Sequence, residues 1–459
     1  MTADPGERVA DERLFAPRYR ALTLATLALV TLGAYENRAT TTVLPLVAED
    51  LDGLRWFGLA SAMSAITFLI ASAVAGAWTD HIGPRRILAG ALATLVVAQI
   101  VAGLAPNMPI LLTGRALSGI GEGAMDVALI VLVADLMPDA VRAKLFAAIA
   151  TAWILPSLIG PGIAGAIADL WGWRASFLVP VVLALPAALV LRPVLARARG
   201  REARPWTKAE RRSIAAAAVV AVGIALLTWG SAAAASGSRV GLPLTLAAVV
   251  LVAIRLARAL PAGTLRLAVG APALVAVTIL VNAAFAALGT YLPLLLTTVR
   301  GEPAALAGIS LTITGVFWAA GSNLASRPFL RESFRPGRMA AAGMALMVLG
   351  AVGPLLLALD VLGLAPAMGV FAVACVGMGV TNNVLSVHLV AIVAPDERGR
   401  YAASRTIAAA VGAAAATAVG GALVAAEADA LTARPIAITV AAGIVVAAVT
   451  GLAALRVDR

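Results

Sequence analysis

Long apolar runs alternate with short polar connections along almost the whole chain. A helix needs about 20 mostly apolar residues to cross a hydrocarbon layer about 30 Å thick. By this rule the sequence predicts about fourteen spans, at residues 21–47, 56–78, 87–104, 108–136, 145–170, 175–191, 214–235, 240–254, 271–296, 304–325, 339–359, 364–393, 401–426 and 435–455. The eighth span is short and uses Arg255 and Arg258 as snorkelling ends. The pattern is typical of an all-α polytopic membrane protein.

Composition agrees with this interpretation. Apolar residues make up 61% of the 459 residues, charged residues only 13%, and the mean hydropathy is +0.96. A soluble globule of this composition would expose large apolar surfaces to water. The net charge of +11 belongs to loops between spans, so we expect a lipid bilayer and not nucleic acid as the surrounding partner.

The basic residues lie in alternate loops. If the N-terminus is cytoplasmic, every second loop is rich in Arg, from Arg85 and Arg86 through Arg142 to Arg398 and Arg400. Cytoplasmic loops carry such an excess of Arg and Lys, so an even number of spans with both termini in the cytoplasm is predicted. Residues 1–20 lack the apolar core of a signal peptide and are expected to form a cytoplasmic tail.

Two parts of the chain resemble each other. Gly119-Ile-Gly121 with Asp126 is echoed by Gly377-Met-Gly379 with Asn383, and each set precedes a Pro-Asp loop. We therefore predict two six-helix halves, with an additional pair of helices that belongs to neither. The expected segments are an N-terminal tail 1–20, a first half 21–191, a basic cytoplasmic linker 192–212, two extra helices 213–258, a connection 259–270, a second half 271–455 and a C-terminal tail 456–459.

The loop after the second span is the most specific motif. It reads Gly76-Ala-Trp-Thr-Asp80-His-Ile-Gly83-Pro-Arg85-Arg86. This loop resembles the signature loop between helices two and three of the major facilitator superfamily, and the layout of six, two and six helices resembles its fourteen-helix drug:proton antiporter branch. The resemblance implies that Gly76, Asp80, Gly83, Arg85 and Arg86 form a conformational latch. We expect the two glycines to let helix backbones approach closely.

The fourth span places Arg115, Glu122 and Asp126 on one helix face. Charges inside a membrane are costly and mark functional sites by default, so Glu122 and Asp126 are candidates for proton coupling with Arg115 as their charge partner. A structural ion pair is the alternative. Arg115-Ala-Leu-Ser-Gly119-Ile-Gly121 also resembles the fourth-helix motif of the superfamily, with Ser118 in place of the usual Gln.

The first span places Glu36, Asn37 and Arg38 near its middle. The segment resembles the first-helix motif of fourteen-helix antiporters, with Glu36 at the position of the acid. Two hypotheses stay open for Glu36. It binds substrate or proton, or it merely neutralises Arg38.

The fifth span contains Gly160-Pro161-Gly162-Ile-Ala-Gly165. This run resembles the antiporter motif of exporters in the superfamily, through Gly160, Pro161 and Gly165, and so favours export. Proline and glycine also permit a kink and close helix packing, which has no directional meaning.

Other polar and aromatic residues within spans are candidates for lining a substrate cavity: Tyr35, Asn37, Trp153, Asn282, Trp318, Asn382, Asn383 and His388. The chain has a single cysteine, Cys375, and only two histidines far apart in sequence, so we expect no metal site and no cofactor. It has neither a nucleotide-binding loop nor a catalytic dyad, so we expect no enzyme and take a proton gradient as the energy source.

The sequence thus predicts a proton-coupled secondary transporter that exports small lipophilic or cationic compounds by alternating access. The expected partners are the substrate and protons, and the expected functional form is a monomer. A lipid or metabolite carrier of the same fold is one alternative, and a non-transporting membrane sensor or assembly protein is the other. Scarce Lys beside abundant Ala and Arg suggests a bacterial source and hence the cytoplasmic membrane.

Overall fold

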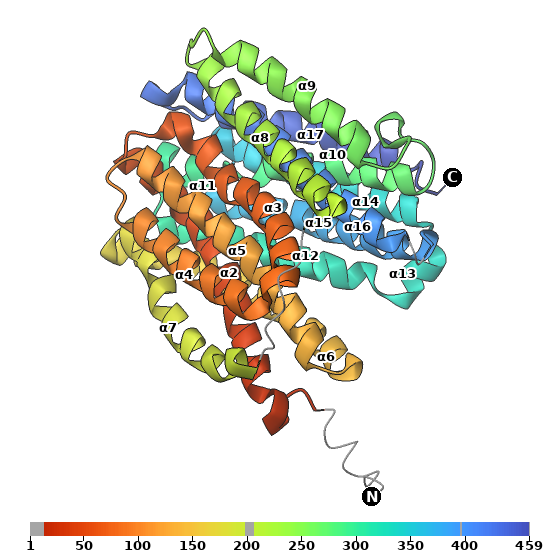
Figure 1. The fold of residues 1–459 in the computed structure, drawn as a ribbon. Coiled ribbons are helices and arrows are strands. Elements are labelled where there is room, and N and C mark those ends of the chain that lie inside the picture. The colour runs from red at the N-terminus through yellow and green to blue at the C-terminus, as the bar shows by residue number, and fades with distance from the viewer. Residues whose placement is uncertain (1–12, 198–205, 395–396, 459) are drawn as a thin grey trace, which may run out of the picture. The chain divides into compact units, whose positions relative to one another are not determined.

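Helices make up nearly all of the computed structural model, which describes residues 13–197, 206–394 and 397–458 (Figure 1). No strand occurs among these residues. The main helices are α2 (Pro17–Asp50), α3 (Phe57–Ile82), α4 (Pro84–Gly103), α5 (Met108–Leu136), α6 (Asp139–Trp171), α7 (Trp173–Arg197), α8 (Lys208–Ala235), α9 (Gly241–Ala259), α10 (Ala271–Gly289), α12 (Ala304–Ala325), α14 (Pro336–Ala358), α15 (Leu364–Ile392), α16 (Arg398–Ala426) and α17 (Arg434–Ala454). Short elements are η1 (Leu54–Trp56), η2 (Thr264–Arg266), α11 (Leu292–Leu294), η3 (Leu295–Val299), α13 (Pro328–Ser333) and η4 (Ala428–Ala430). The all-α prediction is confirmed.

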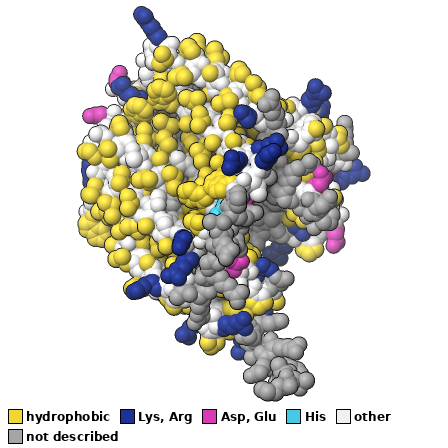
Figure 2. Space-filling model, in the orientation of Figure 1, with side chains coloured by type: hydrophobic (Ala, Val, Ile, Leu, Met, Phe, Trp, Pro, Cys, Tyr) yellow, Lys and Arg dark blue, Asp and Glu magenta, His cyan; other side chains and the backbone are white. Residues whose placement is uncertain are grey.

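A helix lies at each predicted span. Within the described residues, 11 helices are long and apolar enough to cross a membrane, and two shorter apolar stretches lie at Leu155–Trp171 and Gly241–Ala257. Helix α2 is not among them, and it contains Glu36 and Arg38 near its middle. The chain is a multi-pass membrane protein, and the count of fourteen stays a prediction. Figure 2 shows apolar side chains over much of the visible surface, as lipid contact requires.

Helices extend into the predicted tail and linker where the structure describes them. Helix α2 already begins at Pro17, α7 continues to Arg197, and α8 begins at Lys208. Helical geometry therefore extends into both ends of the predicted linker 192–212, and residues 198–205 of that linker lie outside the described part. Residues 1–12 of the predicted tail also lie outside it.

The chain divides into two compact units. The first contains residues 1–43 and 63–221, and the second contains residues 44–62 and 222–459. In the first unit a continuous core of buried Leu, Ala, Val and Met side chains runs along α2, α4, α5 and α7. Burial of these side chains brings the polar residues in the middle of α2 and α5 within reach of each other.

Glycines on α5 make this close packing possible. A Cβ on Gly119 would collide with the Ser64 backbone and the Thr67 side chain of α3. A Cβ on Gly121 would lie 3.0 Å from the Leu95 nitrogen of α4, and one on Gly123 would lie 2.7 Å from the Phe68 oxygen of α3. Helix α5 is therefore in backbone contact with both α3 and α4, as expected for small residues at membrane helix interfaces.

The second unit repeats this arrangement with its own helices. A Cβ on Gly377 of α15 would collide with Gly343 of α14, and one on Gly379 would collide with Trp318 of α12. Contacts to the two preceding helices therefore match Gly377 with Gly121 and Gly379 with Gly123. The predicted repeat is present in the packing, but the glycine matches shift by two residues, and the match of Asp126 by one residue, from the alignment that the sequence suggested. Asp126 then corresponds to Asn382 and not to Asn383.

The additional helix pair packs on the second unit. A Cβ on Gly230 of α8 would lie 3.0 Å from the Thr245 nitrogen of α9, so the two helices are in close contact. The Ser231 hydroxyl of α8 donates to the Ala418 carbonyl of α16 at 3.1 Å. Residues from Val222 onwards cluster with the second unit and the start of α8 with the first, and the assignment of the pair to neither half stays a prediction.

Candidate functional site

A buried ion pair joins α2 to α5 in the first unit. Arg115 Nη1 donates to Glu36 Oε1 at 2.8 Å, and the two side chains are 5% and 1% exposed. The close packing of the α5 glycines and the surrounding apolar core keep this ion pair buried. Removing two charges from water costs several kcal/mol per ion unless each finds a partner, so the pair needs the close geometry that it has.

Neutral side chains extend the pair into a network. Ser118 Oγ donates to Glu36 Oε1 at 3.0 Å, and Gln99 Nε2 of α4 donates to Ser118 Oγ at 2.8 Å. Thr40, one turn after Glu36, accepts from Arg115 Nη1 at 3.2 Å. Helices α2, α4 and α5 are thus connected by one chain of hydrogen bonds.

The second acid of α5 lies against the first acid of α2. The Glu122 carboxyl is within hydrogen-bonding reach of the Glu36 carboxyl, and Asp126 is close enough to act on Glu122 electrostatically. Glu36 Oε2 and Glu122 Oε1 accept no hydrogen bond from any N–H or hydroxyl donor among the described residues. Two carboxylates cannot bond to each other unless one carries a proton. This pair can therefore hold a proton next to a fixed positive charge.

The structure brings together four of the predicted site residues: Glu36, Arg115, Glu122 and Asp126. It does not bring Arg38 to Glu36. Glu36 pairs with Arg115, and Arg38 has no ion pair in the described part of the chain. The hypothesis that Glu36 merely neutralises Arg38 does not describe this structure, because the carboxylate is already engaged on the opposite helix.

The predicted antiporter motif faces α2. A Cβ on Gly160 would lie 3.4 Å from Tyr35 Cδ2 and 4.0 Å from Arg38 Cβ, so α6 approaches α2 at these residues. Pro156 and Pro161 both lie inside α6, and Gly165 is buried. The side chain of Trp153, a predicted cavity residue on the same helix, lies outside the described residues.

The predicted cavity residues of the second unit fall into separate places. Arg405 Nη2 of α16 donates to Asn382 Oδ1 at 2.6 Å, and Asn383 Nδ2 donates to Ser322 Oγ of α12 at 3.0 Å. Asn383 and His388 line a cavity of about 170 Å³ together with other residues of α13, α14 and α15.

Two further candidates lie elsewhere in this unit. Asn282 Nδ2 donates to the Thr278 carbonyl of its own helix at 2.9 Å. Trp318 packs edge-to-face on Phe285, with ring centroids 5.2 Å apart. Asn37 of the first unit is half-buried, and no side-chain hydrogen bond fixes its position in the described residues.

The predicted latch differs from expectation at its first glycine. No atom lies within 4 Å of the position of a Cβ on Gly76, so this glycine is not needed for close approach and that expectation is wrong. Gly83 instead has a φ of +83° where α3 ends and α4 begins, a conformation that favours glycine. Arg85 and Arg86 are exposed, and the Asp80 side chain lies outside the described residues.

A cluster on this loop was missed by sequence reasoning. His81 is buried and stacks on Trp206, with ring centroids 5.6 Å apart, and its Nε2 lies 3.8 Å from Glu210 Oε2. Glu210 also accepts from the backbone and hydroxyl of Thr207, whose own hydroxyl accepts from the Glu210 nitrogen. Thr-x-x-Glu is the signature of a capping box and was the available signal that α8 starts here.

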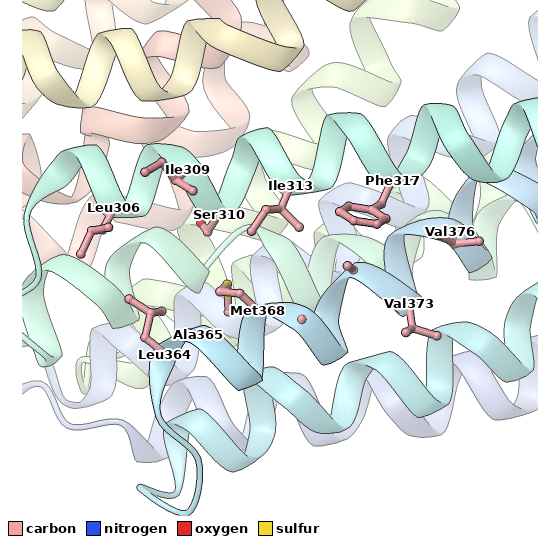
Figure 3. A pocket seen from close by; sticks show the side chains of 12 residues that line it. Leu306, Ile309, Ser310, Ile313, Phe317, Leu364, Ala365, Met368, Val373 and Val376 are labelled. Carbon is pink, nitrogen blue, oxygen red and sulfur yellow. The ribbon is translucent and has the colours of Figure 1, made fainter.

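An apolar groove runs between α12 and α15 in the second unit (Figure 3). Its volume is about 570 Å³, and Ile309, Ile313, Phe317, Met368 and Val373 are among the side chains that line it. Ser310, the one hydroxyl of the lining, donates to the Ala307 carbonyl of its own helix. The groove offers apolar contact with no charged side chain among its lining residues.

Comparison with known proteins agrees with the architecture. The family model described as Major Facilitator Superfamily matches residues 26–417. The chain is 28% identical over 197 residues to the multidrug transporter protein MdtP of Bacillus subtilis, covering 42% of this chain and 35% of that protein. It is 28% identical over 159 residues to the methylenomycin A resistance protein of the same organism, covering 34% of each, and 28% identical over 160 residues to a chloramphenicol efflux pump of Mycobacterium tuberculosis, covering 33% and 37%. These alignments span little more than a third of the relatives' own length.

Solved structures show the same fold at low identity. A peptide transporter of the POT family in complex with sulfate aligns with a TM-score of 0.69 and 15% identity, covering 100% of this chain and 99% of that chain. A bacterial homologue of the human lysosomal transporter Spinster aligns with a TM-score of 0.67 and 16% identity, covering 96% and 98%.

Proposed function

The chain belongs to the Major Facilitator Superfamily, and from that premise we propose that it is a proton-coupled exporter of small lipophilic or cationic compounds. Members of this family are transporters, which confirms the prediction that the chain is not an enzyme. Similarity to efflux proteins over about a third of their length favours export over uptake.

The observation that supports proton coupling is the contact of Glu122 with Glu36, which is itself paired with Arg115. The net charge of the buried cluster with one proton shared by the two carboxyls is one unit more positive than the net charge with both carboxyls deprotonated. Gain or loss of that proton changes the cost of burying the cluster, and so it can bias two conformations of the carrier. Asp126, one turn further along α5, is the second candidate for receiving the proton.

In this mechanism Arg115 keeps a positive charge next to Glu36 in both protonation states. Ser118 and Gln99 hold the Glu36 carboxylate in position through their hydrogen bonds. Binding of substrate and binding of the proton then favour opposite states, as alternating access requires.

The test is transport by the purified protein in sealed vesicles. An imposed pH gradient is expected to drive movement of a lipophilic dye, and Glu122→Gln and Asp126→Asn are expected to abolish the dependence on the gradient. Glu49→Gln removes an exposed acid at the end of α2 and serves as the matched control. Normal gradient-driven transport by both variants would show that these acids do not couple transport to protons.

The apolar groove between α12 and α15 favours a second candidate, a lipid carrier of the same fold. Exchange of a fluorescent phospholipid between leaflets, without transport of the dye, would support that function instead.

A further inference from the structure

Two hydrogen-bond donors on α2 have no acceptor. The Tyr35 hydroxyl and Arg38 Nε are both buried, and neither has a partner among the described residues. Nearly all buried polar groups in folded proteins are hydrogen-bonded, so two unsatisfied groups three residues apart require an explanation.

Both side chains lie on the same side of α2. Residues three apart share a helix face, and both approach one residue of α6, since a Cβ on Gly160 would lie 3.4 Å from Tyr35 and 4.0 Å from Arg38. Tyr35 and Arg38 therefore lie where α2 meets α6. A Cβ on Gly160 would be at ordinary contact distance from both side chains, so α6 passes close to them here.

Arg38 also lacks a counter-ion. Glu36, its neighbour in sequence, is engaged with Arg115 on α5, and no acid pairs with Arg38 in the described part of the chain. An arginine near the middle of a membrane helix is costly without an anion, and its planar guanidinium fits the two oxygens of a carboxylate. A phenolic hydroxyl three residues away can donate to the same group.

We propose that Tyr35 and Arg38 form a subsite for the carboxylate of an amphiphilic substrate. The inference rests on the proposed export function and narrows its substrate class from lipophilic or cationic compounds to those that bear an anionic group. The acids Glu36, Glu122 and Asp126 are left to handle the proton.

Equilibrium binding without any ion gradient tests the subsite separately from transport. The wild-type protein in lipid nanodiscs is titrated calorimetrically with 2-naphthoate and with 2-naphthamide, which share one ring system and differ in charge. A hydrogen-bonded charge pair is worth enough that naphthoate should bind about tenfold more tightly than the amide. Arg38→Gln should remove this preference and leave the affinity for the amide unchanged.

Two further variants keep the result interpretable. Tyr35→Phe should reduce the preference by a smaller factor, whereas Arg20→Gln, which removes an exposed arginine on the same helix, should leave it intact. If Arg38→Gln does not fold, Arg38→Lys can be used in its place. It replaces the planar guanidinium by a compact ammonium charge and should weaken the preference for naphthoate over naphthamide.

Equal affinity of the wild type for the two compounds would overturn the proposal, as would an undiminished preference in the folded Arg38 variant together with Tyr35→Phe. The two proposals fail in different ways. If binding depends on Arg38 but no pH-driven transport occurs, only the proposed export function is refuted. If pH-driven transport occurs but does not depend on Arg38 or on the carboxylate, only the proposed subsite is refuted.

Discussion

Arg115 on α5 donates to Glu36 on α2 across 79 positions of sequence, in a site where both side chains are almost inaccessible to solvent. The same two helices share the hydrogen bonds of Ser118 and Thr40, and apolar side chains pack around them. The Arg115–Glu36 pair should therefore contribute to the stability of the protein, and this contribution can be measured separately from proton coupling.

Removing one member of this pair should destabilise the protein more than removing both. Arg115→Gln leaves a buried carboxylate without its cation, which costs about 3–5 kcal/mol, whereas the double change Glu36→Gln with Arg115→Gln leaves only neutral groups. Thermal unfolding in detergent should show a lower midpoint for the single variant than for the double variant. Additive losses in the two single variants and the double variant would mean that the residues do not interact.

Alanine substitution should destabilise the protein at a glycine that packs against another helix and should have little effect at a glycine with open space around it. Gly119→Ala places a methyl group against Ser64 and Thr67 of α3 and is expected to prevent folding or lower the unfolding midpoint strongly. Gly76→Ala meets no atom within 4 Å and should fold normally. Size-exclusion profiles and unfolding midpoints of the two variants measure the difference. Poor folding of Gly76→Ala together with normal folding of Gly119→Ala would contradict the close contact of α5 with α3 at Gly119.

Tyr291→Phe should weaken the second unit without altering transport specificity. The Tyr291 hydroxyl donates to the Thr417 carbonyl of α16, and its ring lies against Gly420 and 5.6 Å from Phe57. Loss of one buried hydrogen bond costs about 1 kcal/mol, or somewhat more because the carbonyl loses its donor. Thermal unfolding measures the loss, and a changed substrate profile at unchanged stability would instead assign Tyr291 to the transport pathway.

The capping box predicts a local effect at the start of α8. Thr207→Ala removes a side-chain acceptor from the first turn and should cost about 1 kcal/mol of local stability. Amide hydrogen exchange of residues 208–212 should become faster, while Thr207→Ser should leave the exchange rate near that of the wild type. Equal exchange rates in all three proteins would show that the cap does not hold this turn.

Spans and motifs were accessible from the sequence because each depends on neighbouring residues. The apolar run around Met108–Leu136 predicts a helix, and seven- and four-residue spacings put Arg115, Glu122 and Asp126 on one face whatever surrounds them. The capping box at Thr207 and Glu210 was readable for the same reason, although only the structure drew attention to it.

Pairings between helices were not accessible. Arg38 is two residues from Glu36, yet Arg115 takes the carboxylate, because helical geometry directs neighbouring side chains in different directions and α5 packs against α2. The repeat likewise has two plausible registers in sequence, and only the backbone contacts of Gly121 and Gly377 select one.

The sequence by itself determined that this is a multi-pass helical membrane protein of the Major Facilitator Superfamily, since span length, hydropathy and loop motifs are local properties. The tertiary structure alone decided which charges meet, which glycines are contacts and which donors are left without acceptors. Helix packing sets those relationships through the shape of whole faces, and a face is complementary only to the particular neighbour that folding places against it.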